Sequence, residues 1–481
     1  MTEPQLLQIY LGTNEWQTFE AKRVQIQPAR LLETINAFAN TDGGILVIGL
    51  EDASKAKGKE RLFGISENLD NVSESLKLLE KEIEPPLRLW SKFELEITNR
   101  ENQSDRLCVI KVQKSDDVHS LRKGDTYIRR GNQNVRVGAS EIIRLKYEKG
   151  SIKFEDEVSD ITDLSKLDRE LLTRYRANNE SHVVDIWQFM KDNGLAQSTN
   201  DKRYVTKAGA LLFGANPAVG LATSCSIKIS HYYGTKPTYT GDPNFVRRPF
   251  SIEGPLALQI RDAVNYFRDA VKNSPPRLVG SSFKPTLLIP EWAFQEAITN
   301  AVIHRNYFVQ DDIQVRLFDD RIEIESPGSY PGHITPTNIR SERFKRNPLI
   351  ARTLNRFQDP PNLDIGEGVD RIFRVMREQN LYDPIYAPPT TRPNSVLLTL
   401  INQNKIEYWD TVSNYLDDNY RITNQEARRI TSITDSATMS RLLKGWVSKG
   451  LIEKVGTGFR GDVYYKKIGA EIVNPHMQGG V

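Results

Sequence analysis

The segment between residues 15 and 52 constrains the fold more than any other part of the chain. Two glutamates and a lysine come first, an apolar helical stretch follows, and a glycine pair then leads into the apolar run 45–50, which ends in two acids. The residues that carry this pattern are Glu15, Glu20, Lys22, Gly43, Gly44 and Asp52. The glycines favour a tight entry into a strand at positive φ. If the first segment pairs with that strand, three carboxylates and one ammonium meet in one place.

Such a cluster needs a cation, because carboxylates a few ångströms apart raise one another's pKa and do not all ionise alone. A divalent metal ion is a natural counter-charge for carboxylate oxygens. The sequence therefore predicts a Mg²⁺ or Mn²⁺ site at Glu15, Glu20 and Asp52. The alternative is that these acids are solvated surface residues. Lys22 is then a counter-ion to Glu20 rather than a group that stabilises charge on a pentavalent phosphate.

Three stretches give a specific resemblance. The run 37–52 reads Ala-Phe-Ala-Asn-Thr-Asp-Gly-Gly-Ile-Leu-Val-Ile-Gly-Leu-Glu-Asp, and it is followed by Phe63-Gly64-Ile65 and by Tyr-Ile-Arg-Arg-Gly-Asn at 127–132. Together with the first acidic segment they resemble the Schlafen-type AlbA-like domain, once called a divergent ATPase domain.

This resemblance implies an α/β lobe that binds nucleic acid, with Arg129 and Arg130 as contacts. In the ribonuclease branch of the family, two glutamates and an aspartate hold metal and cut RNA. The matching residues here are Glu15, Glu20 and Asp52, with Lys22 beside them.

Length and composition limit the class of protein. A chain of 481 residues is too long for one ordinary core and indicates several modules. No apolar run approaches the roughly 18 residues of a membrane span, and the start lacks the order of a signal peptide, so we expect a cytoplasmic protein without a membrane partner. Cys108 and Cys225 lie in apolar strand-like surroundings and are expected to be buried thiols. The net charge of +3 means that any basic surface is local.

The predicted fold class is α/β (α+β) multidomain. The expected parts are an AlbA-like lobe, a linker with an α+β connecting region, an ATPase-like α/β sandwich, a winged helix and a flexible tail, at 1–150, 151–280, 281–402, 403–470 and 471–481. The acidic stretch 149–168 is interpreted as the linker itself.

A second pattern lies on a helix predicted from residue 291 to residue 307. Glu296, Asn300 and His304 fall at i, i+4 and i+8, so they share one face of that helix. An acid to activate water, an amide to hold magnesium and a nearby base suit a nucleotide site. The alternative is a solvated helix face.

This helix resembles the first box of the ATPase fold shared by gyrase, the ninety-kilodalton heat-shock chaperones, mismatch-repair proteins and histidine kinases. The match is to a divergent branch found in proteins described as related to the RecG helicase. It implies ATP as a ligand, with magnesium on Asn300 and phosphate contacts near Gly328, Gly366 and Gly368, since glycines at a helix start let amides reach a phosphate. The chain has no G-x-x-x-x-G-K-[ST] loop, which argues against a helicase.

One departure from the ATPase pattern concerns the base. Ser326 stands where the wider family has the aspartate that recognises adenine. A serine hydroxyl cannot make the charge-assisted hydrogen bond of a carboxylate. ATP as a sensing or structural ligand with slow or absent hydrolysis is therefore the preferred interpretation.

The C-terminal part predicts a winged helix. Helices are expected at 406–415, from Thr423 onward and at 436–450, followed by strands at 451–455 and 463–467. The third helix and the wing offer four basic residues to a duplex: Arg441, Lys444, Lys454 and Arg460. Protein contacts are the alternative. A salt-dependent, weakly selective grip on phosphates is the expectation.

Three functions compete. The first is a metal-dependent endoribonuclease that acts on structured RNA such as tRNA and is gated by nucleotide. The second is an ATP-sensing, DNA-binding transcription regulator without catalysis, and the third is an interaction scaffold. The packed acids favour the first, because a lobe that only binds phosphate gains nothing from them, while the winged helix favours the second. Phage defence and gene regulation are both compatible with the resemblance. Animal Schlafen nucleases cradle RNA between two lobes, so this single lobe predicts a homodimer.

Overall fold

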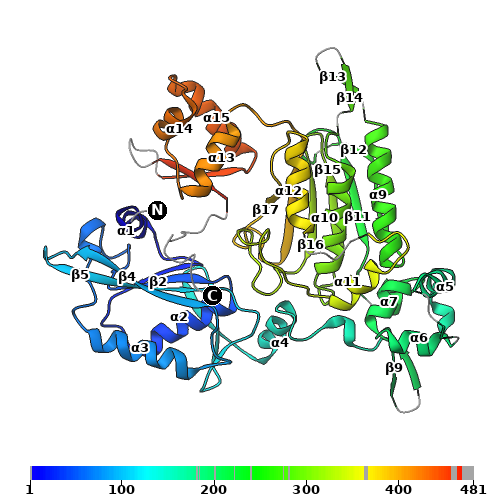
Figure 1. Ribbon diagram of the computed structural model, residues 1–481, viewed down its shortest axis with the longest axis horizontal. Helices are drawn as coiled ribbons and strands as arrows, with labels where there is room; N and C mark the ends of the chain where they lie inside the picture. The colour runs from blue at the N-terminus through cyan, green and yellow to red at the C-terminus, as the bar shows by residue number, and fades with distance from the viewer. Residues whose placement is uncertain are drawn as a thin grey trace. The chain divides into compact units, whose positions relative to one another are not determined.

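The computed structural model describes most of the chain as two compact units (Figure 1). The described residues run from 3 to 468, with gaps at 180–181, 184, 200–201, 222, 239–240, 275, 280–281, 286, 362–366 and 457–462; for 275–286 only the backbone is described. Unit 1 comprises Met1–Ser151, Gly332–Thr337 and Tyr408–Val481. Unit 2 comprises Ile152–Pro331 and Asn338–Glu407. The predicted tail 471–481 and the residues Gly366 and Arg460 lie outside the described part.

The N-terminal part of unit 1 is built on a four-stranded sheet in the order β1-β2-β5-β4. The strands are β1 Phe19–Lys22, β2 Gly44–Ile48, β5 Ser104–Val112 and β4 Trp90–Thr98. Strand β1 pairs with β2 in parallel, with Glu20 opposite Leu46 and Lys22 opposite Ile48, which confirms the predicted pairing. Gly43 has φ +76° and lies against the backbone of β5, so the tight strand entry is confirmed as well.

The two faces of this sheet carry different cores, because side chains alternate along a strand. Phe19 and Ala21 pack with Leu6 and Tyr10 of helix α1 (Glu3–Gly12). The opposite face packs against helices α2 (Pro28–Asn40) and α3 (Leu69–Glu82). Glu20 alternates with Phe19 and Ala21, so its side chain lies on the α2 face.

Several short elements complete the lobe. They are 3-10 helix η1 Gly58–Arg61, strands β3 Ile83–Glu84 and β6 Ser120–Leu121, the hairpin of β7 Thr126–Arg130 and β8 Gln133–Val137, and helix α4 Ala139–Glu148. The β7–β8 hairpin packs on α2 and brings Arg129 toward β1.

The C-terminal part of unit 1 has three helices followed by an antiparallel strand pair, in the predicted order. They are α13 Trp409–Asp418, α14 Asn424–Thr431, α15 Ser436–Ser448, β19 Ile452–Val455 and β20 Tyr464–Lys467. Thr423 and Glu426 form the expected capping box at the start of α14. The first helix begins three residues later than predicted, after Tyr408, which has a left-handed backbone with φ +72°.

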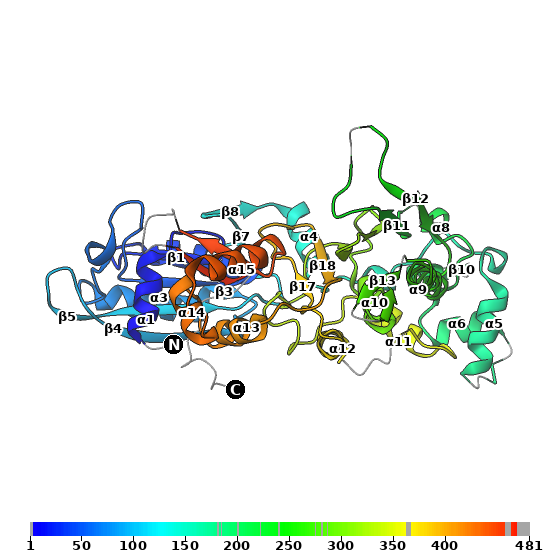
Figure 2. The same ribbon diagram turned by 90° about the horizontal axis from the view of Figure 1, so that it is seen from above.

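Unit 2 contains a six-stranded sheet in the order β12-β11-β15-β16-β18-β17. Its strands are β12 Phe245–Ile252, β11 Ile227–Tyr232, β15 Ile313–Leu317, β16 Arg321–Pro327, β18 Ser395–Ile401 and β17 Ile385–Tyr386. Helices α9 (Leu256–Lys272), α10 (Glu291–His304) and α12 (Gly368–Glu378) lie side by side against it (Figures 1 and 2). The α+β multidomain class is therefore confirmed.

The remaining elements of unit 2 are shorter helices and two antiparallel strand pairs. They are η2 Phe154–Asp156, η3 Leu164–Lys166, α5 Arg169–Asn178, α6 Ile186–Asp192, β9 Ala196–Thr199, β10 Lys202–Val205, α7 Lys207–Phe213, α8 Pro217–Leu221, β13 Pro276–Val279, β14 Ser282–Pro285 and α11 Pro348–Asn355.

The interpretation of 149–168 as a linker is wrong. Phe154, Ile161 and Leu167 are buried in the main core of unit 2. The Glu155 carboxylate accepts hydrogen bonds from the backbone N–H groups of Leu349 and Ile350, at 2.9 Å each, in the first turn of α11. A helix start attracts an acid in this way, so this acidic residue is a packed cap rather than a solvated side chain.

Two smaller expectations are also tested. Both cysteines are buried, and burial raises the pKa of each thiol to about 11, as expected for inert thiols. Within the described residues, no helix combines the length and apolar character needed to cross a membrane.

Candidate nucleic-acid and nucleotide sites

The acidic cluster of unit 1 centres on Lys22, at the end of β1. Its Nζ lies 2.9 Å from Glu15 Oε1 and 2.6 Å from Glu20 Oε1. Glu15 Oε1 also accepts a hydrogen bond from the backbone N–H of Ala21 at 3.3 Å. The structure thus brings together three of the four residues predicted to be catalytic, through one ammonium.

Arg129 neutralises the other side of Glu20. Its side chain is fully buried, forms an ion pair with Glu20 Oε2, and donates to Trp16 O at 3.0 and 3.2 Å and to Asn134 Oδ1 at 2.8 Å. The prediction that Arg129 contacts nucleic acid is therefore wrong, because its buried guanidinium already pairs with the buried carboxylate of Glu20. Arg130 is exposed, with one long ion pair of 3.6 Å to Glu141.

Asp52 lies just beyond β2, and its carboxylate interacts electrostatically with Lys22 and Glu15. Its Oδ1 accepts a hydrogen bond from Ser54 N at 2.9 Å. Burial acts to raise the pKa of Asp52, but the hydrogen bonds from Ser54 and the charge of Lys22 hold it below the usual value. Burial raises the pKa of Glu15, and the charges of Glu20 and Asp52 add to that rise while Lys22 opposes it.

Lys22 responds in the opposite sense. Burial acts to lower its pKa, yet the charges of Glu20 and Glu15 and the hydrogen bonds to them raise it above the usual value. The ammonium therefore keeps its proton throughout the physiological range, and the cluster keeps a permanent positive charge at its centre.

A divalent ion fits the chemistry of this cluster but not the present arrangement of its side chains. Among the residues that the structure describes, no three His, Cys, Asp or Glu side chains are grouped to hold a metal ion. Glu15, Glu20 and Asp52 are suitable oxygen donors. However, Lys22 stands between the two glutamates, and Arg129 takes the second oxygen of Glu20.

A further cation near the cluster, the buried Arg61, was missed by sequence reasoning. Its Nε donates to Glu51 O at 2.7 Å, and its Nη1 donates to Leu11 O at 2.6 Å. Burial lowers the pKa of Arg61, whereas Asp52 and Glu15 act to raise it. Nothing in the polar run Lys-Gly-Lys-Glu-Arg distinguishes this arginine from its solvated neighbours.

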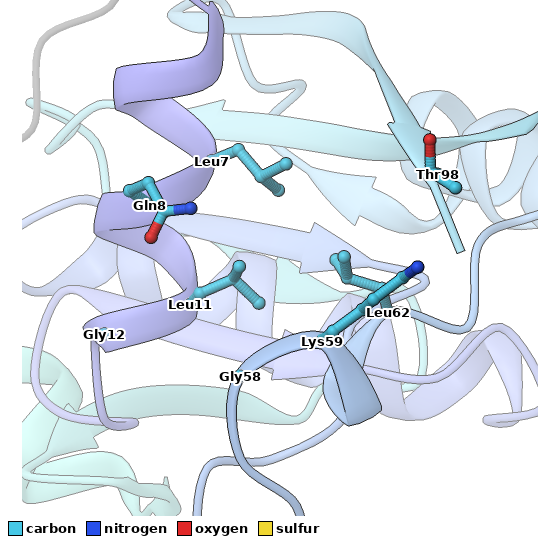
Figure 3. Close-up of a pocket in the computed structure, with 8 residues that line it drawn as sticks. All are labelled: Leu7, Gln8, Leu11, Gly12, Gly58, Lys59, Leu62 and Thr98. Carbon is cyan, nitrogen blue, oxygen red and sulfur yellow. The ribbon is translucent and has the colours of Figure 1, made fainter. Parts of the chain in front are cut away.

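An open pocket of about 550 Å³ is lined by Leu62, the residue after Arg61, but is not part of the acidic cluster (Figure 3). Leu7 and Leu11 of α1 face Leu62 across it, and Lys59 and Thr98 lie at its edge. None of the four predicted catalytic residues lines this pocket.

In unit 2, the predicted nucleotide residues do share one face of α10. Glu296, Asn300 and His304 are half-buried, while Ala297 and Ala301 beside them are buried. Asn300 Nδ2 donates to Glu296 Oε1 at 3.1 Å. Burial raises the pKa of Glu296, and Asn300 and the charge of Arg371 oppose that rise.

Gly368 brings the start of α12 against Glu296. A Cβ atom added at Gly368 would lie 1.7 Å from Glu296 Oε1, so only a glycine allows this approach. An acid is stabilised at a helix N-terminus by the N–H groups there. The carboxylate of Glu296 thus lies beside the helix start that the sequence assigns to a phosphate contact.

The turn after β16 carries Gly328, with φ +100° and its backbone N–H donating to Asn394 O at 2.9 Å. Ser326 Oγ donates to Ala301 O at 2.9 Å, so its proton already serves the backbone of α10. Arg346, which sequence reasoning missed, donates to His304 O at 2.8 Å and to Ser329 O at 2.6 Å. Its guanidinium joins the end of α10 to this turn.

In the C-terminal part of unit 1, the predicted basic residues that the structure describes are exposed. Arg441 and Lys444 are one helical turn apart on α15, and Lys454 is on β19. Asp435 caps α15 through the N–H groups of Ala437 and Thr438. Because the side chains of Arg441, Lys444 and Lys454 are exposed, they are accessible to phosphates.

Two family models match parts of the chain. Residues 15–138 match the model described as "Schlafen, AlbA_2", and residues 310–400 match the model described as "Putative ATP-dependent DNA helicase recG C-terminal". The chain thus contains the two domain types that its motifs resemble. The first match includes the acidic cluster, whereas the second begins after α10 and its three predicted nucleotide residues. Together they indicate a protein that binds nucleic acid and has a nucleotide-related function.

Comparisons of the whole chain with other proteins add little to these two family matches. The crystal structure of the DIP2311 protein from Corynebacterium diphtheriae is similar over 97% of each chain, with 17% sequence identity and a TM-score of 0.41. No curated protein matches this chain.

Proposed function

We propose that this protein is a metal-dependent endoribonuclease that acts on structured RNA such as tRNA, with its reaction centre at Glu15, Glu20, Lys22 and Asp52. The observation that carries the proposal is the double contact of Lys22 Nζ with Glu15 and Glu20, at 2.9 and 2.6 Å. The half-buried Glu15 and the buried Glu20 around a retained ammonium suit the handling of a phosphodiester better than passive binding, because free acids repel phosphate.

Each side chain of the acidic cluster has its own role in this proposal. A lysine ammonium has three donors, and the two glutamates take two of them, which leaves one N–H for a phosphate oxygen. Burial raises the pKa of Glu15 above its usual value, which suits a carboxylate that accepts and returns a proton. A divalent ion bound by Glu15, Glu20 and Asp52 would supply further positive charge at the phosphate.

The test is an RNA-cleavage assay with purified protein, total tRNA and either Mn²⁺ or Mg²⁺. We expect wild type to cut, and Asp52→Asn and Glu20→Gln to lose activity while keeping side-chain shape. Glu96→Gln, an exposed acid on β4, is the matched control and should cut like wild type. Equal cleavage by wild type and both cluster variants would refute the proposal.

A second function is favoured by a specific observation. Both oxygens of Glu20 are ion-paired, to Lys22 and to Arg129, as in a purely structural salt bridge. That arrangement supports an ATP-sensing, DNA-binding regulator without catalysis, which would use the basic face of α15. In that case wild type leaves tRNA intact and binds duplex DNA, and Arg441→Ala weakens binding and reduces its salt dependence.

We also propose that the face of α10 and the start of α12 respond to ATP. The support is the shared face of Glu296, Asn300 and His304 and the close approach of Gly368. ATP with magnesium should raise the thermal midpoint of wild type, because a ligand that binds the folded state stabilises it. Asn300→Ala should abolish that shift, whereas Asn265→Ala, on the exposed side of α9, should keep it. Absence of a shift in wild type at millimolar ATP would reject the nucleotide site.

Two copies of the chain are proposed to assemble, since each supplies one AlbA-like lobe. Light scattering coupled to size-exclusion chromatography should give the mass of a dimer at micromolar concentration. A monomer mass there would remove this part of the proposal.

A further inference from the structure

Trp16 differs from the other tryptophans of this protein in its exposure. The chain has six tryptophans, and all six lie in the described residues. Trp16 is 59% exposed, while the other five are buried or half-buried. Its large aromatic face is therefore accessible to a ligand. Its neighbour in the sequence is Glu15, a member of the acidic cluster.

The backbone at Trp16 is held firmly although the side chain is exposed. Trp16 N donates to Phe19 O at 3.0 Å, and Trp16 O accepts two hydrogen bonds from Arg129, the same guanidinium that pairs with Glu20. Any displacement of Trp16 would therefore also disturb the partner of Glu20. The position of the indole is thus coupled to the geometry of the acidic cluster.

The next residue fixes the turn from its other side. Gln17 Nε2 donates to Asp42 Oδ2 at 2.9 Å and to Arg129 O at 3.0 Å, and Gln17 Oε1 accepts from Gly131 N at 2.8 Å. The benzo ring of Trp16 lies beside Gly131, where an added Cβ would be 3.5 Å from Cζ3. The indole therefore sits on a rigid support and keeps more than half of its surface in water.

The surroundings of the ring point to one kind of ligand. Arg130, 60% exposed, precedes Gly131 on the same hairpin, and Lys22 lies in the cluster that begins next to Trp16. An exposed aromatic ring on a preorganised backbone, in a lobe that also carries cations, suits an unpaired nucleotide, whose base stacks on the ring while its phosphates meet the cations.

We propose that Trp16 is a stacking platform for the base of an unpaired nucleotide, next to the phosphodiester that reaches Lys22. The placement beside the scissile bond rests on the proposed nuclease function. The stacking itself does not, because it needs only a single strand on the lobe. The expected ligand is single-stranded RNA, or a loop or bulge of structured RNA, whose bases are free to leave their own stack.

The test measures binding of a fluorescent single-stranded RNA to the full-length protein in EDTA, where metal-dependent cleavage is suppressed. Removal of the aromatic ring under one stacked base by alanine substitution weakens binding by about 5- to 150-fold, and we expect a value in this range for Trp16→Ala. Trp16→Phe should retain most of the affinity, because it keeps an aromatic face. Trp16→Leu should behave like alanine, because it keeps apolar size without that face.

Two controls separate stacking from other contacts. Tyr233→Ala removes an aromatic side chain of similar exposure, 61%, from unit 2, and should bind RNA like wild type. A strand with abasic sites keeps its phosphates but offers no bases, so wild type and Trp16→Ala should bind it equally. The slope of affinity against salt should be the same for both proteins, because no charge is changed.

The outcomes are distinguishable. If Trp16→Ala binds the intact strand as tightly as wild type, or Trp16→Leu does, stacking is overturned, whatever the cleavage assay gives. If wild type binds no single-stranded probe, stacking is overturned too. If wild type binds RNA with the expected loss in Trp16→Ala yet never cuts tRNA with Mn²⁺ or Mg²⁺, stacking stands and the nuclease proposal fails.

Discussion

Replacing Arg129 with methionine tests how the acidic cluster is held together. The guanidinium is fully buried, pairs with the 5%-exposed side chain of Glu20, and makes three further hydrogen bonds to Trp16 and Asn134. Removing one partner of a buried ion pair costs about 3 to 5 kcal/mol, because the other charge stays buried and uncompensated. Lys22 remains on the second oxygen of Glu20, so we expect the lower end, about 3 kcal/mol.

Hydrogen exchange followed by mass spectrometry measures this loss where it occurs. The full chain has two units, so a single unfolding midpoint would mix their stabilities. A loss of about 3 kcal/mol corresponds to roughly hundredfold faster exchange for protected amides of β1 and β7. Peptides from the sheet of unit 2 should be unaffected and serve as the internal reference.

The matched control is the neighbouring arginine. Arg130 is 60% exposed and lies 3.6 Å from Glu141, so Arg130→Met should change stability by less than about 1 kcal/mol. Adding Glu20→Gln to Arg129→Met should recover part of the loss, because it removes the orphaned charge. If exchange in β1 is as slow in Arg129→Met as in Arg130→Met, the ion pair does not hold the cluster and the reasoning fails.

Further predictions concern other buried or tight positions. Burial and the charge of Lys114 lower the pKa of Lys149 from 10.5 to about 7. Between these two pH values the unfolded state binds more protons than the folded state, so the free energy of unfolding should fall as the pH drops toward 7. Urea titrations of Lys149→Met should show a flatter pH dependence of this free energy than wild type. Gly368→Ala should displace the Glu296 carboxylate and reduce the ATP response, whereas Gly445→Ala on α15, where an added Cβ meets open space, should stabilise by about 0.5 to 1 kcal/mol; an unchanged ATP response in Gly368→Ala would contradict the contact at α12. Asp116→Ala should speed hydrogen exchange in 332–337, because His333 contacts Asp116 Oδ1 through its backbone N and its Nδ1 at 2.7 and 2.8 Å; unchanged exchange there would refute an anchoring role.

The local parts of this structure were predictable because their signals are local. The glycine pair before an apolar run predicted the entry into β2, and the Thr423–Glu426 spacing predicted the cap of α14. The i, i+4, i+8 spacing on α10 predicted a shared face, and Asn300 does bond to Glu296. Each of these depends on residues that a single strand entry or a few helical turns bring together.

The pairings that define the candidate site were not predictable in this way. Arg129 is 109 residues from Glu20, and Glu155 is 194 residues from Leu349, so no periodicity in the sequence links either pair. Arg129 was therefore assigned to nucleic acid and the segment around Glu155 to a linker. The composition of a segment reports its average polarity, whereas tertiary contacts decide which of its charges are buried.

The distance along the chain between Glu20 and Arg129 also has a consequence for synthesis. Translation proceeds from the N-terminus, so Glu15, Glu20 and Lys22 leave the ribosome long before Arg129 does. A nascent chain shorter than this arginine holds the acids without the guanidinium that anchors them. The complete cluster is thus a property of the finished lobe, and it forms only after Arg129 has left the ribosome.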